Sequence, residues 1–303
     1  MDLITTNELC KAYSGKLVID HVNMHIPEQS IYGFVGENGS GKTTIMRLLT
    51  GLAEPTSGSF TLFGVENKNP NIYKVREQVS AIVEATSLIP SMTARDNMIY
   101  QELYLGVTLN EEQRRELLQK VHLEDVGEKK VKNFSLGMKQ RLGIALALMN
   151  HPKLMLLDEP MNGLDPEGIA ELRELLIELN QKEGITVLIS SHILSELEKI
   201  ASCYGFISHG HLLEEITAEE LQNKCRKSVG VKVSDVTKAE SVLNNLGIKD
   251  YKAYPSGDIK IFENIAINDL VMAFSKAEIT VLGINSQDES VEDYYLNLIK
   301  EDK

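Results

Sequence analysis

The sequence contains few cysteines, and they form no recognisable pattern. The three are Cys10, Cys203 and Cys225. Their wide separation matches neither a disulfide framework nor a zinc site. We therefore expect them to be buried or incidental thiols.

Long hydrophobic runs are also missing. The longest, such as residues 144–149 and 154–157, are far shorter than the roughly 18 to 20 residues that cross a bilayer. Residues 1–9 include Asp2 and Glu8 and lack the basic start and apolar stretch of a secretory signal. The sequence thus predicts a cytoplasmic protein without a membrane span.

The chain has no excess of positive charge. It has 31 lysines and arginines against 44 aspartates and glutamates, which gives a net charge of −13. Such a surface repels a phosphate backbone, and no basic run offsets it, so we expect no nucleic-acid partner.

The length of 303 residues, with 43% hydrophobic and 25% charged, is typical of a soluble globular protein with one large domain, or a large and a small one.

The clearest motif is a glycine-rich loop between a predicted strand at 31–35 and a predicted helix from Thr44. It fits the phosphate-binding pattern G-x-x-x-x-G-K-[ST]. In such loops, glycines let backbone N–H groups turn toward phosphates, and the helix N-terminus adds partial positive charge. We expect Lys42 to reach the terminal phosphates of the ligand and the Thr43 hydroxyl to bind Mg²⁺. The predicted nucleotide-binding residues here are Gly36, Asn38, Gly39, Ser40, Gly41, Lys42, Thr43 and Thr44.

Two adjacent carboxylates, Asp158 and Glu159, follow the apolar run at 154–157. Short apolar runs that alternate with helical segments predict a parallel sheet, and ligands bind at the carboxyl ends of such strands. We expect Asp158 to hold Mg²⁺ and Glu159 to act as general base or to orient the attacking water. Together with the glycine loop, these residues predict a phosphate-loop NTPase.

A third segment, residues 134–140, begins a predicted helix and places Ser135 and Gly137 at its N-terminus, where anions bind. Here the chain resembles the ABC ATPase family, whose signature S-G-G-Q starts such a helix. The resemblance implies that two cassettes pack head to tail, with Ser135 and Gly137 on the γ-phosphate bound by the partner chain. Leu136 and Met138 depart from the signature.

The resemblance extends over roughly residues 3–215 and implies roles for three more residues. Asp165, in Gly-Leu-Asp at 163–165, is similar to the acidic member of the loop that signals between the two sites. His192 is similar to the switch histidine that contacts the γ-phosphate. Tyr13 is similar to the aromatic residue on which adenine stacks.

One departure from the family concerns the loop after the predicted strand at 82–83. The family generally has glutamine there, which touches Mg²⁺ or the lytic water and couples to the membrane subunit, and this chain has Glu84. A carboxylate is a harder metal ligand, so we expect altered coupling and retained metal binding. With this glutamate, the chain resembles the branch of bacitracin-type and lantibiotic self-immunity transporters.

We expect an α/β phosphate-loop NTPase of ABC ATPase type, with a mixed sheet core and an antiparallel N-terminal sheet. It would occupy residues 1–216, with a helical subdomain at about 88–138. Thr93 with Asp96, and Asn110 with Gln113, predict capping boxes there. Residues 217–303 predict a small α+β accessory domain of split βαβ type. Its predicted strands are 229–233, 249–254, 258–262 and 279–284, and its predicted helices are 237–246, 267–276 and 290–300.

The resemblance implies an ATP-hydrolysing subunit that powers export by separate integral membrane subunits, with an antimicrobial peptide as cargo. It would pair with a second ATP-binding subunit, as a homodimer, and lie peripherally on the cytoplasmic face of the membrane. The alternatives are an exporter motor for another drug or lipid and a soluble ABC ATPase outside transport. We interpret the sequence His-Gly-His at 209–211 as a hairpin turn and not as a pair of metal ligands.

Overall fold

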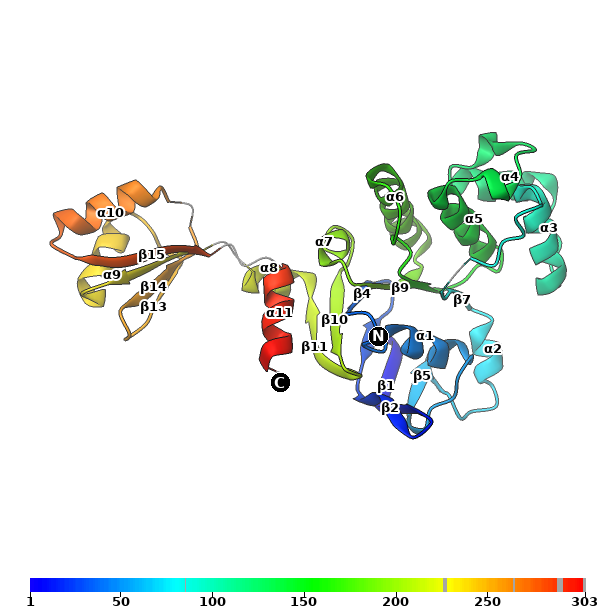
Figure 1. Cartoon of the computed structure of the whole chain (residues 1–303), viewed down its shortest axis with the longest axis horizontal. Coiled ribbons are helices and arrows are strands. Elements are labelled where there is room, and N and C mark those ends of the chain that lie inside the picture. Colours follow the sequence, from blue (N-terminus) through cyan, green and yellow to red (C-terminus); the bar gives the residue numbers. More distant parts are fainter. Residues whose placement is uncertain (85, 226–227, 264, 288–290, 302–303) are drawn as a thin grey trace. The chain divides into compact units, whose positions relative to one another are not determined.

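The computed structural model describes residues 1–84, 86–225, 228–263, 265–287 and 291–301 (Figure 1). Their contacts divide the chain into two compact units. The N-terminal unit comprises Met1–Ala218 together with Ile299–Lys303, and the C-terminal unit comprises Glu219–Leu298. No helix in the described ranges is both long and apolar enough to span a membrane.

A six-stranded sheet forms the centre of the N-terminal unit, in the order β11-β10-β4-β9-β8-β7. Neighbouring strands run parallel except for β11, which pairs antiparallel with β10. The inner strands β4, β8 and β9 are buried almost throughout, because helices cover parallel sheets on both faces and their strands are therefore continuously apolar. The strands are β4 (Ile31–Val35), β7 (Val79–Ile82), β8 (Leu154–Asp158), β9 (Thr186–Ser191), β10 (Cys203–Ser208) and β11 (His211–Thr217).

A second, antiparallel sheet is built mainly from the first part of the chain, in the order β2-β1-β5-β6, with β3 also paired to β1. The helix α1 (Lys42–Thr50) buries Ile45, Leu48 and Leu49 in a hydrophobic core that includes residues of both sheets. Figure 1 shows α1 between the two sheets, on the side of the central sheet away from α6. The strands are β1 (Asp2–Tyr13), β2 (Lys16–Val22), β3 (His25–Pro27), β5 (Ser57–Leu62) and β6 (Val65–Glu66).

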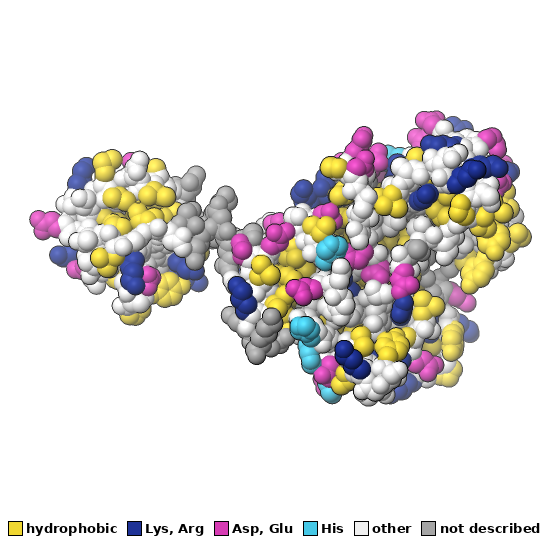
Figure 2. All heavy atoms as spheres, in the orientation of Figure 1, with side chains coloured by type: hydrophobic (Ala, Val, Ile, Leu, Met, Phe, Trp, Pro, Cys, Tyr) yellow, Lys and Arg dark blue, Asp and Glu magenta, His cyan; other side chains and the backbone are white. Residues whose placement is uncertain are grey.

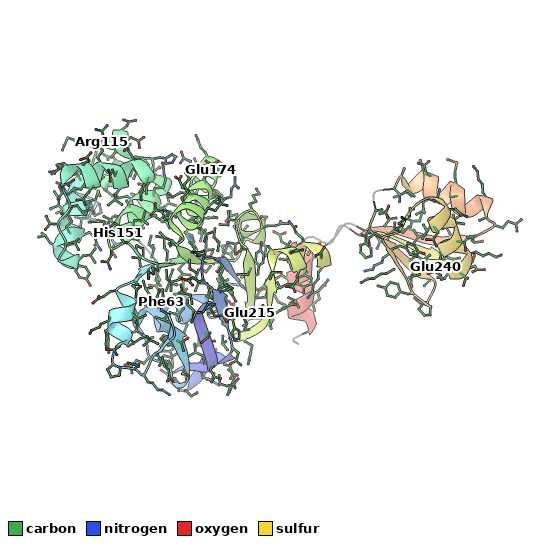
Figure 3. All side chains as sticks on the ribbon, turned by 180° about the vertical axis from the view of Figure 1, so that it is seen from behind. Phe63, Arg115, His151, Glu174, Glu215 and Glu240 are labelled. Carbon is green, nitrogen blue, oxygen red and sulfur yellow. The ribbon has the colours of Figure 1, made fainter. Side chains whose placement is uncertain are left out.

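Glu215 on β11 (Figure 3) joins the two sheets. Its carboxylate accepts hydrogen bonds from the Tyr32 hydroxyl on β4 at 2.8 Å and from the His25 backbone N–H on β3 at 2.7 Å. Burial, reinforced by this carboxylate, raises the pKa of Tyr32 well above its ordinary value. The phenol therefore stays protonated and keeps donating.

Helices surround the central sheet and form a separate group at α3 to α5 (Figure 1). Both predicted capping boxes are confirmed: Thr93 with Asp96 opens α3, and Asn110 with Gln113 opens α4. The predicted turn at 209–210 is also confirmed, between β10 and β11. The helices are α2 (Ile72–Arg76), α3 (Ala94–Leu105), α4 (Glu111–Lys120), η1 (Glu124–Val126), η2 (Val131–Asn133), α5 (Leu136–Leu148), α6 (Pro166–Glu183) and α7 (Leu194–Leu197).

A buried ion pair joins α3 to α4. Arg114 donates to both carboxylate oxygens of Glu102, at 2.6 and 2.7 Å, and the two side chains are only 11% and 5% exposed. These hydrogen bonds hold the pKa of Glu102 below its usual value. A group with a lowered folded-state pKa contributes stability above its unfolded pKa, and this contribution is lost as the pH falls through the folded value.

We expect Arg114→Met to lower the free energy of unfolding near neutral pH by about 3 kcal/mol, because it leaves a buried carboxylate without its partner. As the pH falls through the lowered folded-state pKa of Glu102, the carboxyl becomes protonated in both states, and the difference from the native protein should shrink. Urea unfolding followed by circular dichroism measures both values. The control is Arg95→Met, whose exposed pair with Glu111 is screened by solvent and should contribute much less stability. Equal losses in the two variants would contradict the assignment.

The C-terminal unit has the predicted split βαβ arrangement. Its sheet is antiparallel, in the order β13-β14-β12-β15, and Leu243 of α9 and Phe274 of α10 lie in its core. Residue 290, where the last helix was expected to begin, lies outside the described residues. The elements are β12 (Ser228–Val233), α9 (Val236–Asn245), β13 (Tyr251–Ala253), β14 (Asp258–Ile261), α10 (Ile267–Lys276) and β15 (Val281–Gln287), with α8 (Ala218–Lys224) before and α11 (Val291–Glu301) after them.

Candidate active site

The glycine loop connects the buried strand β4 directly to α1, as the sequence predicts. Two glycines are required there for different reasons. A Cβ on Gly36 would lie 2.5 Å from Ser40 Oγ and 2.6 Å from the Ile207 carbonyl oxygen, so no side chain fits. Gly41 has φ +116, a conformation that L side chains rarely adopt. The loop therefore turns tightly and leads directly into the first residue of α1.

Lys42 is buried at the centre of this loop, with 5% of its side chain exposed. Its ammonium donates to the carbonyl oxygens of Gly36 at 2.6 Å and Glu37 at 3.2 Å. The nearby Ser40 hydroxyl is buried without a hydrogen-bond partner among the described residues. A buried hydroxyl without a partner is costly unless a ligand completes it. The loop thus offers an ammonium and a free hydroxyl to a phosphate group.

Thr43 and Asp158 meet at the carboxyl edge of the central sheet. The Thr43 hydroxyl donates to Asp158 Oδ2 at 2.7 Å, and the Ser190 hydroxyl donates to Asp158 Oδ1 at 2.6 Å. Asp158 ends β8 and pairs in register with Ser190 of β9. Both carboxylate oxygens are therefore held by hydroxyls, and the Thr43 and Asp158 oxygens form the hard-oxygen pair that suits Mg²⁺.

Glu159 lies between two other groups of the site. Its Oε1 is 3.2 Å from the Lys42 ammonium, and its Oε2 is 2.8 Å from His192 Nδ1. The backbone at Glu159 has φ +48, in the left-handed region, and its N–H donates to Ser190 Oγ at 2.9 Å. The carboxylate is 22% exposed, so it is accessible to a water molecule while its position is fixed from both sides.

Two residues near this cluster were missed by sequence reasoning. Ser190 orients both Asp158 and the Glu159 backbone. Its only sequence signal was a polar residue near the end of a predicted apolar strand. Glu196 on α7 lies close enough to interact electrostatically with His192 and Glu159. Burial raises the pKa of Glu196, and the Glu159 charge adds to this while His192 opposes it. We find no sequence signal that distinguishes Glu196 from an ordinary helical glutamate.

Glu84 follows β7, as predicted, but its carboxylate pairs with Arg47 on α1 and is 59% exposed. Arg47 follows the phosphate loop by one helical turn, so the loop after β7 is tied to α1 close to Lys42 and Thr43. In the described chain, no contact joins Glu84 to Thr43 or Asp158, and metal binding by Glu84 stays a prediction.

Ser135 and Asp165 cap two adjacent helices. Ser135 Oγ accepts a hydrogen bond from the Met138 N–H at the start of α5, and an Asp165 carboxylate oxygen accepts one from the Gly168 N–H at the start of α6. A Cβ on Gly137 would lie 3.8 Å from Leu164, so the two helix starts are neighbours. Within the described residues, neither Ser135 nor Asp165 has a side-chain contact with Lys42 or Glu159.

Tyr13 ends β1, and its ring is 42% exposed. The Lys11 ammonium lies over this ring, 4.9 Å from its centroid. An exposed aromatic face beside a cation can stack on a purine base. The structure therefore leaves Tyr13 accessible, and its contact with adenine stays a prediction.

Comparisons with known proteins agree with this geometry. Residues 19–162 match the family described as ABC transporter. The chain is 40% identical over 299 residues to the bacitracin transport ATP-binding protein BcrA of Bacillus licheniformis, covering 98% of this chain and 97% of that protein. It is 46% identical over 213 residues to the lantibiotic transport ATP-binding protein SrtF of Streptococcus pyogenes, covering 70% and 90%. The fold matches a dimeric bacterial ABC transporter cassette with a TM-score of 0.63 and 25% identity, over 71% of this chain and 98% of that one.

Proposed function

Because the chain belongs to the ABC transporter family, as one of its ATP-binding, ATP-hydrolysing subunits, we propose that the cluster of Lys42, Thr43, Asp158, Glu159 and His192 is its hydrolytic centre. The observation that carries this proposal is the position of Glu159 between Lys42 and His192. A carboxylate held there can accept a proton from the attacking water, while Lys42 stabilises the terminal phosphates.

Each residue then has a defined role. Mg²⁺, bound by Thr43 and Asp158, would neutralise phosphate charge. His192 holds Glu159 in place, and Ser190 fixes Asp158 and the Glu159 backbone together. The backbone of the loop and the Ser40 hydroxyl bind phosphate oxygens. Tyr13 stacks on the adenine.

A second copy of this chain would complete the site. ABC subunits act as pairs. Ser135, Gly137 and Asp165 lie on adjacent helix starts, and among the described residues none of them contacts Lys42 of the same chain. Helix N-termini attract anions. Ser135 and Gly137 would therefore bind the γ-phosphate held by the partner chain. The loop that contains Asp165 would signal between the two sites. We propose a homodimer that closes on two ATP molecules.

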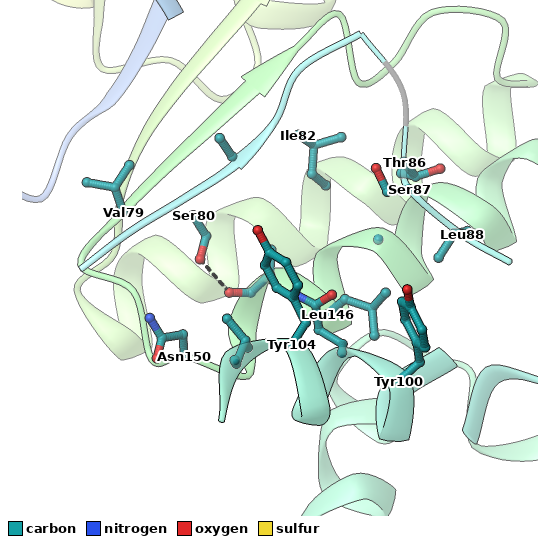
Figure 4. A pocket seen from close by; sticks show the side chains of 15 residues that line it. Val79, Ser80, Ile82, Thr86, Ser87, Leu88, Tyr100, Tyr104, Leu146 and Asn150 are labelled. Carbon is teal, nitrogen blue, oxygen red and sulfur yellow. Dashed lines mark hydrogen bonds between the residues drawn. The ribbon is translucent and has the colours of Figure 1, made fainter. Parts of the chain in front are cut away.

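The membrane subunits would dock on a groove lined by residues on both sides of Glu84 in the sequence, among them Ile82 and Thr86. This pocket, of about 490 Å³, lies between β7, α3 and α5, and Tyr100 and Tyr104 project over it (Figure 4). Tyr104 is 82% exposed and Leu103, its neighbour, 78%, and hydrophobic side chains gather over α3 on this face (Figure 2). Through these partners the protein would lie peripherally on the cytoplasmic face of a membrane.

A pull-down tests the transporter assignment. Tagged Glu159→Gln protein is recovered from detergent-solubilised membranes with ATP present, and its partners are identified by mass spectrometry. We expect one or two multi-span membrane proteins. Recovery of ribosomes or DNA-repair proteins instead would favour a soluble ABC ATPase.

The same pull-down tests whether the membrane subunits bind at the docking groove. We expect Tyr104→Ala to reduce recovery of the membrane subunits about tenfold or more, because exposed aromatic anchors often dominate interfaces. The control is Tyr73→Ala, whose 72% exposed ring lies on α2, outside the groove. A loss of equal size in both variants, or none for Tyr104, would place docking elsewhere.

For cargo, we propose a bacitracin-like or lantibiotic peptide. The proposal is supported by the names of the two relatives, which are similar to this chain over most of their length. Deletion of the gene should increase sensitivity to such peptides. Unchanged sensitivity would exclude them and favour another drug or a lipid.

A further inference from the structure

Three side chains with metal-binding atoms converge on the antiparallel sheet, outside the hydrolytic centre. Cys10 comes from β1, and Asp20 and His21 come from β2. The Cys10 sulfur, an Asp20 carboxylate oxygen and a His21 ring nitrogen all lie within 4.8 Å of one another. Asp20 Oδ1 is 2.5 Å from His21 Nδ1.

The backbone of both strands departs from regular geometry to bring these atoms together. Adjacent residues of a regular strand point to opposite faces of a sheet. His21 has φ +48, in the left-handed region, which breaks this alternation and places its ring beside the Asp20 carboxylate. The β1–β2 register shifts between Leu9 and Lys11, so Cys10 lies at an irregularity. The His21 backbone N–H donates to the Cys10 sulfur at 3.2 Å.

A fourth potential ligand comes from a distant part of the sequence. His211, the first residue of β11, places Nε2 3.5 Å from Asp20 Oδ2. The backbone fixes this approach, since the Asp20 N–H donates to the Gly210 carbonyl oxygen at 2.9 Å. A simple ion pair between Asp20 and His21 would require neither Cys10 nor His211 at this position.

We propose that Cys10, Asp20, His21 and His211 form a binding site for one zinc-type divalent ion. A thiolate, a carboxylate and two imidazoles suit such an ion, whose ligand atoms lie about 2.0 to 2.3 Å from it in a tetrahedron. The sulfur comes from a residue that is only 3% exposed, whereas the two imidazole side chains are 63% and 49% exposed. The exposed imidazole rings can therefore rotate to coordinate an ion that is already bound by the buried sulfur. On binding, the thiol proton passes to solvent.

The site lies next to the β10–β11 turn, which contacts the phosphate loop. Gly210, which accepts from Asp20, itself donates to the Ser40 carbonyl oxygen at 2.9 Å. A bound ion would cross-link the β1–β2 hairpin to the β10–β11 turn close to this loop. Because it binds only the folded arrangement of these segments, it should raise thermal stability.

Cobalt(II) titration of the full chain tests the proposal. The protein carries no polyhistidine tag, is stripped of metal with a chelator and is kept free of nucleotide. Co²⁺ replaces Zn²⁺ in tetrahedral sites and gives a sulfur-to-metal charge-transfer band only when a thiolate binds it. The band therefore distinguishes this site from the oxygen ligands Thr43 and Asp158.

We expect the band to saturate at one ion per chain, to disappear when Zn²⁺ is added, and to be absent in Cys10→Ser. It should persist in Cys203→Ser and Cys225→Ser, the matched controls. His21→Asn and His211→Gln, at exposed positions that should leave folding intact, should weaken binding about tenfold or more. Zn²⁺ should raise the melting temperature of the native chain and not that of Cys10→Ser. The absence of the band, or its loss in a control instead of in Cys10→Ser, would overturn the proposal.

Discussion

Replacing Glu159 by glutamine is expected to lower the rate constant of ATP hydrolysis about 10²- to 10⁴-fold, the usual range for a lost general base. Glutamine keeps the shape of the side chain and one oxygen, so contacts with Lys42 or His192 can persist. It cannot take a proton from water at neutral pH. The variant should therefore bind ATP and stall before hydrolysis.

Phosphate release from purified protein, measured together with ATP binding, separates these effects. Glu178→Gln is the control, because Glu178 is an exposed residue of α6 whose carboxylate pairs with Lys182. Its turnover should stay unchanged. If Glu159→Gln kept turnover within about tenfold of the native rate, the general base would have to be another group.

Replacing Lys42 by methionine is expected to lower kcat/KM for ATP about 10²- to 10³-fold, the scale for loss of one charged or hydrogen-bonding group that stabilises the transition state. Methionine is apolar, fits a long buried cavity and cannot hold phosphate charge. The change also removes the cation 3.2 Å from Glu159 Oε1, so the carboxylate would keep only its contact with His192.

The matched control is Lys182→Met, which removes an exposed lysine from α6. Steady-state hydrolysis over a range of ATP concentrations gives kcat and KM separately. A rise in KM alone would mean that Lys42 binds substrate and transition state equally, whereas a fall in kcat places it in the transition state. An unchanged kcat/KM would contradict its role in either step.

Short-range patterns were sufficient for much of the fold. The two capping boxes at Thr93 and Asn110 were visible because a capping box involves residues three apart in the chain. The C-terminal unit was predictable because its strands and helices alternate with clear apolar periodicity, and α10 begins and ends at the predicted residues. The order of strands in that sheet follows from the βαββαβ sequence of elements.

The candidate site was only partly predictable. Lys42, Thr43, Asp158 and Glu159 belong to compact motifs, and the structure brings them together. Ser190 and Glu196 have no such motif, because their roles arise from strand register and helix position. The position of Glu84 in the loop after β7 can be seen in the sequence, but its pairing with Arg47 depends on how this loop approaches α1.

By itself, the sequence determined the phosphate loop, the carboxylate pair and the family, because each is written in residues close together along the chain. The tertiary structure decided which distant residues meet. It joined Glu159 to Lys42 and His192. It also gathered Cys10, Asp20 and His21 and brought His211 to Asp20, although the spacing of the cysteines indicated no metal site. The reason is physical: strand register and a left-handed residue set where side chains point, and neither is encoded in local spacing.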